Sequence, residues 1–504
     1  MVVATSMLSL TCMSHDAIIT GHGAALPDGA DVILFRSYGQ MGTSVASDTM
    51  KDGKFTLTVP TDTTLFEAML SITAKGFPST SRKLYITPSA RIDVDIPDYY
   101  ARTWPVKSNV AEQIQFDRFI NKSKNLIDSL LQMNIDYTNA LAEITDNAAR
   151  DSVKQAYNEN KWLRDSLNNE IAMRDIELLR DSEVGNIWFA KAEDLVRGDL
   201  SAEALKSFND IFNNLDVALR TSAAGTRIQS LLNPPHLLKI GDTVPEVDLY
   251  DIEGKAHHLS YFSGKWILLE FGSRGCYACM IAKPELQELS KNLADKLEVV
   301  TLSIDTEKMW REEAKDTTII WNNWNEGNED LGLYRQFGAK GLPTFVFISP
   351  EGKIAYSTLG YAKGSLERIF KQLSTPRKPM NISHKGDKIL ITSPAIDENN
   401  TSGILDITAV EISNDATTLF FTVDYNPGMW ITISPKSQLI TADGKHYAIK
   451  NCEGIVAGEK FYADENGKGS FNISFEPIPE NTPSFDFTES SDGSRWFING
   501  IHIK

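Results

Sequence analysis

Hydrophobic and polar positions divide the chain into four long stretches. Residues 18–100 and 380–504 alternate apolar and polar positions with a period of two, which is typical of half-buried strands. Residues 105–233 carry apolar positions at helical spacing, and residues 236–375 alternate short apolar runs with helical patterns. We therefore predict a multidomain α+β protein. A β-sandwich and a helical segment precede a central α/β domain, and a β-sandwich-like domain follows it.

Two runs show the strand period in the first β stretch. Residues 55–59 read Phe-Thr-Leu-Thr-Val, and residues 92–96 read Ile-Asp-Val-Asp-Ile. Turns at Asp28-Gly29 and Asp52-Gly53 separate such runs. We expect a small β-sandwich that carries no chemistry.

A helix in the second stretch should begin near Ser201. The Ser201 hydroxyl can cap its N-terminus, and Glu203 falls in the first turn, near the positive end of the helix dipole. Apolar stripes of this kind predict helix packing rather than a ligand groove. The stripe of this helix is Leu205, Phe208, Phe212, Leu215 and Leu219.

Strands and helices alternate in the central domain, after the linker Asn233-Pro234-Pro235, and a hairpin over Glu351-Gly352-Lys353 ends the pattern. This order predicts a central sheet covered by helices. The predicted strands are 246–250, 265–271, 297–304, 344–349 and 354–359, and the predicted helices are 276–293, 306–315, 328–337 and 364–373.

The last stretch returns to alternation, as in residues 419–425 and 471–475, with turns at Asp443-Gly444 and Asn466-Gly467. It follows a proline-rich segment, residues 375–379. These features predict the second sandwich-like domain.

Charge and composition argue against several classes of partner and ligand. The chain of 504 residues has a formal net charge of −17, which argues against nucleic acid or an anionic membrane surface as a partner. No second Cys-x-x-Cys and no spaced histidine pair occur, so we expect no metal site; His257 and His258 would point to opposite faces of a strand. We also expect no cofactor. No run of about eighteen apolar residues predicts a spanning helix.

The N-terminus allows two interpretations. Residues 1–17 contain an apolar stretch like that of a secretion leader, but the first lysine or arginine is Arg36. Residues 9–12, Ser-Leu-Thr-Cys, loosely resemble a bacterial lipobox, in which Cys12 would be lipidated and anchor the protein in the outer membrane. The alternative is an ordinary leader or tail cysteine.

Cys276 and Cys279 are the residues of the sequence that point most clearly to a chemical reaction. They follow an apolar, strand-like run and a Gly/Ser turn, and they open a helical pattern within FGSRGCYACMIAKPELQEL, residues 271–289. Amide groups and the dipole at a helix N-terminus can lower the pKa of the first thiol to roughly 3.5–7.5. We predict that Cys276 is the nucleophile and Cys279 the resolving thiol of a redox pair. Cys452 is predicted to be a buried or idle thiol.

Residues 239–374 resemble a thioredoxin-fold domain of the TlpA/ResA kind, from bacterial envelope thiol-disulfide oxidoreductases often grouped with the alkyl hydroperoxide reductase/thiol-specific antioxidant (AhpC/TSA) family. The resemblance depends on Gly241-Asp242-x-Val244-Pro245, the Cys276-Tyr277-Ala278-Cys279 motif, Pro284, and Gly341-Leu342-Pro343-Thr344 before a strand. The layout of the chain also resembles envelope proteins of Bacteroidota, with a β domain, a helical segment, a thioredoxin-like domain and a β tail.

The resemblance implies roles for further residues. Pro343 is a cis proline facing the disulfide in that family, where the backbone of Leu342 can pair with an extended substrate. Tyr277 lies beside this path. Glu270 occupies the place of a buried acid beneath the disulfide, which could relay the proton that Cys279 must lose. The implied partners are protein disulfide substrates and an upstream membrane thiol reductase, in the periplasm or cell envelope.

The sequence departs from the family at two positions. Gly275 replaces the usual tryptophan before the first cysteine, and Ala282 stands where a glutamate is common, so cytochrome c maturation is a doubtful analogy. Arg274 could stabilise the Cys276 thiolate or face solvent.

Two other functions stay open. A thiol peroxidase would need a Pro and a Thr before its cysteine, which residues 271–275 lack. A non-catalytic envelope binding or scaffold protein would use its thioredoxin domain only for docking.

Overall fold

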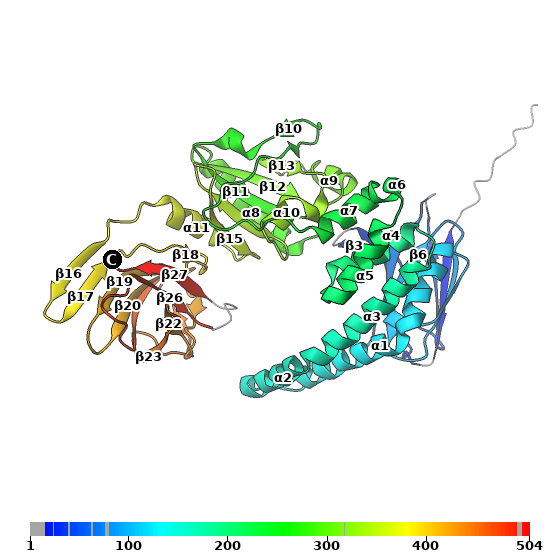
Figure 1. Ribbon diagram of the computed structural model, residues 1–504, viewed down its shortest axis with the longest axis horizontal. Coiled ribbons are helices and arrows are strands. Elements are labelled where there is room, and N and C mark those ends of the chain that lie inside the picture. Colours follow the sequence, from blue (N-terminus) through cyan, green and yellow to red (C-terminus); the bar gives the residue numbers. More distant parts are fainter. Residues whose placement is uncertain are drawn as a thin grey trace, which may run out of the picture. The chain divides into compact units, whose positions relative to one another are not determined.

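The computed structural model describes residues 16–23, 25–38, 41–61, 64–75, 80–316, 318–490 and 496–504 (Figure 1). Its contacts divide the chain into two compact units, residues 1–235 and 236–504. Cys12 and nearly all of the predicted leader lie outside the described residues, so lipidation stays a prediction. Among the residues described, no helix has the length and apolar character needed to cross a bilayer.

The first unit begins with two four-stranded sheets packed around one core, among the residues described. The apolar residues of 55–59 and 92–96 point inward as predicted, because Phe55, Leu57 and Val59 are at most 3% exposed. This is the predicted sandwich. One sheet has the order β4 (Lys54–Val59), β1 (Ala17–His22), β7 (Arg91–Asp95), β8 (Val106–Ser108), and the other β3 (Met41–Thr49), β2 (Asp31–Tyr38), β5 (Phe66–Thr73), β6 (Thr80–Ile86).

Helices complete the first unit and share the core of the sandwich through Phe116, Phe119 and Trp188. They are η1 (Ala101–Thr103), α1 (Ala111–Ala142), α2 (Asn147–Glu159), α3 (Lys161–Arg180), α4 (Asn186–Arg197), α5 (Ala202–Asn213), α6 (Val217–Arg220) and α7 (Ala223–Leu232).

Helix α5 begins as predicted but ends early. The Ser201 hydroxyl accepts a hydrogen bond from the Ala204 N–H at 3.2 Å. The predicted stripe is wrong in part, because Leu205 is 39% exposed while Phe208 and Phe212 are buried. Leu215 and Leu219 lie beyond the helix, which ends at Asn213, because Asn213, Asn214 and Asp216 have low helix propensity.

Among the residues described, the second unit begins with a seven-stranded sheet, in which the interior strand β11 is parallel to β12 and antiparallel to β14. The sheet order is β10 (Ala256–His257), β9 (Leu249–Tyr250), β13 (Asn322–Asn325), β12 (Leu297–Ser303), β11 (Trp266–Gly272), β14 (Thr344–Ile348), β15 (Ile354–Leu359). Its helices are η2 (Leu259–Phe262), α8 (Tyr277–Asn292), α9 (Glu307–Glu313), η3 (Glu329–Leu331), α10 (Leu333–Gln336) and α11 (Ser365–Ser374).

Two hydrophobic clusters lie on opposite faces of this sheet. Leu269 and Phe271 of β11 belong to the cluster that includes α10, whereas Leu268 packs with residues of α8 and α11. Because successive strand residues point to opposite faces, Glu270 projects to the same face as Leu268, toward α8. This alternation places the predicted acid under the helix that carries the cysteines.

Two predictions for this domain need correction, and one strand of its sheet, β13, was missed. The strand expected at 246–250 is only Leu249–Tyr250. The helix expected at 328–337 is interrupted at Gly332, where the Glu326 carboxylate accepts the Leu333 N–H at 2.7 Å and starts a new turn. Strand β13 was not predicted, because its sequence, Asn-Asn-Trp-Asn, lacks an apolar run.

In the part of the C-terminal domain that the structure describes, ten strands form one antiparallel ladder, where a sandwich-like fold was predicted. Strands from both ends of the ladder contribute to a single core, so the sheet curls around it. The order is β16 (Asn381–Lys385), β17 (Lys388–Thr392), β19 (Leu405–Ile412), β20 (Thr417–Asp424), β25 (Lys468–Phe475), β23 (His446–Glu453), β22 (Gln438–Thr441), β26 (Ser484–Thr488), β27 (Phe497–His502), β18 (Glu398–Asn399); β21 (Trp430–Ile431) pairs with β24 (Phe461–Tyr462).

Candidate active site

The two cysteines of the predicted redox pair are joined as a disulfide at the start of α8, with their Cα atoms 5.2 Å apart. Cys276 is the N-cap residue, and its sulfur accepts a hydrogen bond from the Cys279 N–H at 3.1 Å. Cys276 is half-buried, whereas Cys279 is 5% exposed. After reduction, the N–H group and the helix dipole would stabilise a thiolate on Cys276. An incoming sulfur can therefore reach Cys276 more easily than Cys279.

Asp305 holds the loop that leads to Cys276. Its carboxylate accepts a hydrogen bond from the Ser273 hydroxyl at 2.7 Å and another from the Arg274 N–H at 2.7 Å. The Cys276 N–H donates to the Ser273 carbonyl at 3.0 Å, which closes the turn before the helix. Sequence reasoning missed Asp305. Its position just beyond β12, the parallel neighbour of β11, was the available indication.

Pro343 lies beside this loop because of the strand register. Phe271 of β11 pairs with Thr344 of β14, so Pro343 falls next to Gly272, where the loop to Cys276 begins. The Leu342–Pro343 peptide bond is cis, as the family resemblance implied. The Pro343 carbonyl accepts the Gly360 N–H at 2.7 Å. Leu342 is half-buried and Tyr277 is 71% exposed, so both can be reached by a partner.

Glu270 is 3% exposed and is held by a short hydrogen-bonded chain. The Trp321 indole N–H donates to the Thr301 hydroxyl oxygen at 2.9 Å, and the Thr301 hydroxyl donates to Glu270 Oε2 at 2.6 Å. Burial raises the pKa of Glu270 to about 7, against the lowering effect of the Thr301 hydrogen bond. A carboxyl group with this pKa can both accept and release a proton at neutral pH.

Charged side chains near the cysteines are paired with one another. Arg274 forms an ion pair with Glu312 and is about half exposed, which fits the solvent-facing alternative considered for it. Lys283, on α8, lies 3.1 Å from Glu313 and 3.5 Å from Asp316. Lys283 lowers the pKa of Glu270 slightly, and Glu313 raises it.

A buried carboxylate ties α8 to the segment that follows β15. Glu285 accepts hydrogen bonds from the Tyr361 hydroxyl at 2.7 Å, the Gly364 N–H at 2.7 Å and the Glu367 N–H at 3.0 Å. Helix α11, which begins at Ser365, in turn contacts the C-terminal domain, where Arg368 Nη1 donates to Asn426 Oδ1 at 3.1 Å. Glu285 therefore fixes the helix of the cysteines against the segment next to Pro343.

The histidines, tryptophans and remaining cysteine of this unit have structural contacts or lie apart from the redox pair. His257 lies 2.6 Å from Asp251, and His258 lies 2.7 Å from Asp248; no group of residues in the described ranges has the makings of a metal site. Trp310, Trp321 and Trp324 are at most 9% exposed and pack in the interior of the domain. Cys452 is a free, half-buried thiol whose pKa is raised by burial.

Three kinds of comparison with known proteins relate to the central domain. Residues 240–357 match the model of the AhpC/TSA family. The thiol-disulfide oxidoreductase ResA of Bacillus cereus is 25% identical over 179 residues, which cover 32% of this chain and 96% of that protein. ResA of Bacillus anthracis gives the same identity and coverage.

Solved structures match the same part of the chain. The thioredoxin domain of a thiol-disulfide oxidoreductase from Bacteroides vulgatus is 25% identical with a TM-score of 0.23, over 25% of this chain and 91% of that one. The exposed lipoprotein thioredoxin of Streptococcus pneumoniae is 23% identical with a TM-score of 0.24, over 26% of this chain and 100% of that one.

Proposed function

We propose that this chain, whose central domain is that of a TlpA/ResA-like thiol-disulfide oxidoreductase, reduces or exchanges protein disulfides in the cell envelope. The observation that carries the proposal is the asymmetry of the cysteine pair. Cys276 is accessible at a helix N-terminus, whereas Cys279 is buried, on the side of the sheet toward which Glu270 projects. A nucleophile, a resolving thiol and a proton acceptor are thus available in the order that exchange requires.

The reaction follows from these positions. The Cys276 thiolate attacks one sulfur of the substrate disulfide, a mixed disulfide forms, and the first substrate thiolate leaves. Glu270 takes the proton of Cys279, whose thiolate then attacks the Cys276 sulfur and releases the second substrate thiolate. Two electrons pass to the substrate, and Cys276–Cys279 becomes a disulfide. A membrane dithiol reductase would return two electrons to restore the pair.

Substrate recognition is proposed for the backbone at Leu342 and Pro343. An extended segment that pairs there as an added strand would bring its disulfide toward Cys276, since Pro343 lies beside the loop of that cysteine. The exposed ring of Tyr277 would border this path. The flanking domains would select partners or position the redox domain in the envelope.

The test is insulin disulfide reduction by the full chain, together with the reduction potential of the pair in glutathione or dithiothreitol buffers. Cys276→Ser should abolish turnover, whereas Cys279→Ser should accumulate a mixed disulfide with the substrate, visible on a non-reducing gel. Cys452→Ser is the matched control and should retain activity. A potential near about −270 mV supports a reductase, and one near about −120 mV indicates an oxidant.

Two outcomes would favour the alternatives. Peroxide consumption by the reduced chain, faster than insulin reduction, would indicate a thiol peroxidase. A reversible disulfide without turnover of any protein disulfide would indicate a binding or scaffold protein.

A further inference from the structure

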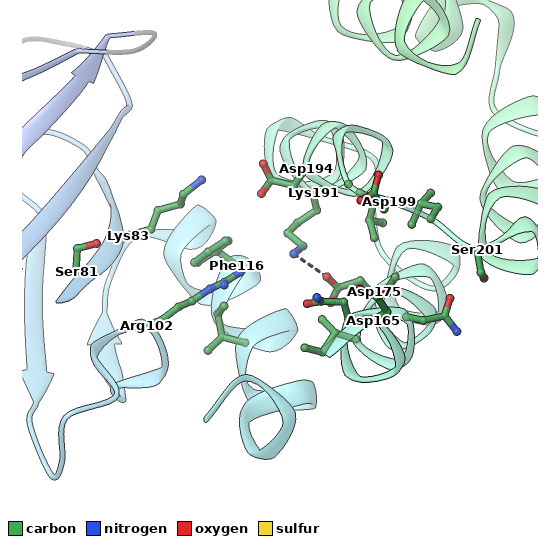
Figure 2. A pocket seen from close by; sticks show the side chains of 18 of the residues that line it. Ser81, Lys83, Arg102, Phe116, Asp165, Asp175, Lys191, Asp194, Asp199 and Ser201 are labelled. Carbon is green, nitrogen blue, oxygen red and sulfur yellow. Dashed lines mark ion pairs between the residues drawn. The ribbon is translucent and has the colours of Figure 1, made fainter. Parts of the chain in front are cut away.

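A cleft of about 840 Å³ lies in the first unit, far along the chain from the cysteines. It is bordered by β6 and η1 on one side and by α1, α3, α4 and the segment before α5 on the other (Figure 2). A volume of this size falls in the range of roughly 300–1,000 Å³ that small-molecule and peptide ligands occupy. No pattern in the sequence predicted a ligand site there.

The two walls of the cleft carry opposite charges. Lys83 and Arg102 come from the sheet side, and Asp194 and Asp199 from the helix side, as Figure 2 shows. Apolar side chains, including Phe116, line the cleft between them. A ligand that fits must therefore offer a negative group, a positive group and an apolar body.

Some of these charges already have partners within the protein. Lys191 and Asp175 form an ion pair at 2.7 Å with 11% and 5% of their side chains exposed, and Lys83 forms an ion pair with Glu67 at 3.1 Å. By contrast, the side chains of Arg102, Asp194 and Asp199 form neither an ion pair nor a hydrogen bond with other described residues. They are the charges available to a ligand.

Two buried polar atoms of cleft-lining residues also lack partners. Arg82 is 1% exposed, and its Nε–H has no hydrogen-bond acceptor in the described part of the chain, although its terminal nitrogens bond to the Arg102 carbonyl and to Asp117. The side-chain oxygen of Asn169 has no donor. A buried polar group left unpaired is costly, so these atoms favour a ligand with both a donor and an acceptor. The peptide group has both.

We propose that the cleft binds a short peptide with free ends, its carboxylate toward Arg102 and its ammonium toward Asp194 and Asp199. The unpaired atoms of Arg82 and Asn169 would bond to the peptide backbone, and Phe116 would contact an apolar side chain. This site is independent of the disulfide chemistry, and its test does not depend on the proposed function.

Isothermal titration of the full chain with trileucine, N-acetyl-trileucine and trileucine amide tests the proposal. The free peptide should bind at least tenfold more tightly than either blocked form, because each block removes one charge-assisted contact. Arg102→Gln should abolish the preference for the free carboxylate and leave the preference for the free amine. The double variant Asp194→Asn/Asp199→Asn should abolish the preference for the free amine and leave the preference for the free carboxylate.

Matched controls separate local from general charge effects. Arg118→Gln changes an exposed arginine of α1, and Asp210→Asn/Asp216→Asn changes two exposed aspartates, all outside the cleft. These variants should bind like the wild type. The proposal is overturned if trileucine does not bind, if blocked and free peptides bind equally, or if the controls weaken binding as much as the cleft variants do.

Discussion

Replacing Thr301 with valine tests whether its hydroxyl sets the proton affinity of Glu270. The hydroxyl donates to Glu270 Oε2 at 2.6 Å and lowers the pKa of the carboxyl, which burial raises to about 7. A hydrogen bond to a charged group contributes roughly 1.5–3 kcal/mol, and a change of one in pKa corresponds to about 1.4 kcal/mol. Loss of this bond should therefore raise the pKa of Glu270 by about one to two.

The assay follows the decay of a pre-formed mixed disulfide on Cys276 from about pH 5 to about pH 9. In the wild type the rate should rise as Glu270 loses its proton near pH 7. In Thr301→Val the midpoint should move to higher pH, and the carboxyl resonance of Glu270 in ¹³C-labelled protein should titrate with it.

Thr301→Ser is the control, because it keeps the hydroxyl and should keep the wild-type midpoint. The valine variant also removes the acceptor of the Trp321 N–H, so its free energy of unfolding should fall by about 1–3 kcal/mol, measured separately in urea. If the carboxyl of a folded Thr301→Val titrates at or below the wild-type pH, the hydroxyl does not control Glu270 and the reasoning fails.

Three further predictions concern the surroundings of the cysteines. The pKa of Glu270 in the folded protein, about 7, exceeds its ordinary value of 4.5, so the associated stability is fully present below about pH 4.5 and is lost as pH rises through 7. The free energy of unfolding of the oxidised protein, measured in urea, should fall by about 3 kcal/mol over that pH range. Glu270→Gln should not show this fall, and an equal pH dependence in both proteins would contradict the prediction. Asp305→Ala should lower the free energy of unfolding by about 2–3 kcal/mol and speed hydrogen exchange at the Arg274 amide, with Asp305→Asn intermediate; unchanged exchange would argue against its role in the loop. Glu285→Ala removes three hydrogen bonds and should cost about 2–4 kcal/mol with faster exchange at Gly364 and Glu367, whereas Glu288→Ala, on the same helix, should leave both amides protected.

Prediction from the sequence succeeded where the hydrophobic pattern of a segment matches the burial of its residues in the folded protein. The run at 55–59 alternates cleanly and forms part of β4, and β15 matches its predicted bounds of 354–359. The comparisons confirm the resemblance and the enzyme class, which depended on the spacing of Cys276, Cys279 and Pro343.

The remaining features depend on contacts between distant segments. Thr301 and Trp321 form the chain to Glu270 only because three separate strands or loops meet there, and no local pattern marks either residue. Asp305 and Glu285 likewise act through backbone groups far along the sequence. The cleft was missed for the same reason, since its charges come from one sheet and several helices.

The raised pKa of Cys452 gives the reduced protein an unusual chemical selectivity. At neutral pH burial keeps this thiol protonated, so it reacts slowly with alkylating reagents, and the buried Cys279 is shielded as well. Cys276 is then the cysteine of the described chain that a brief exposure to iodoacetamide should modify first. A fluorescent or affinity tag could thus be attached at the reacting sulfur without engineering the chain. Because the tag occupies the sulfur that attacks the substrate, loss of disulfide exchange should follow the extent of labelling.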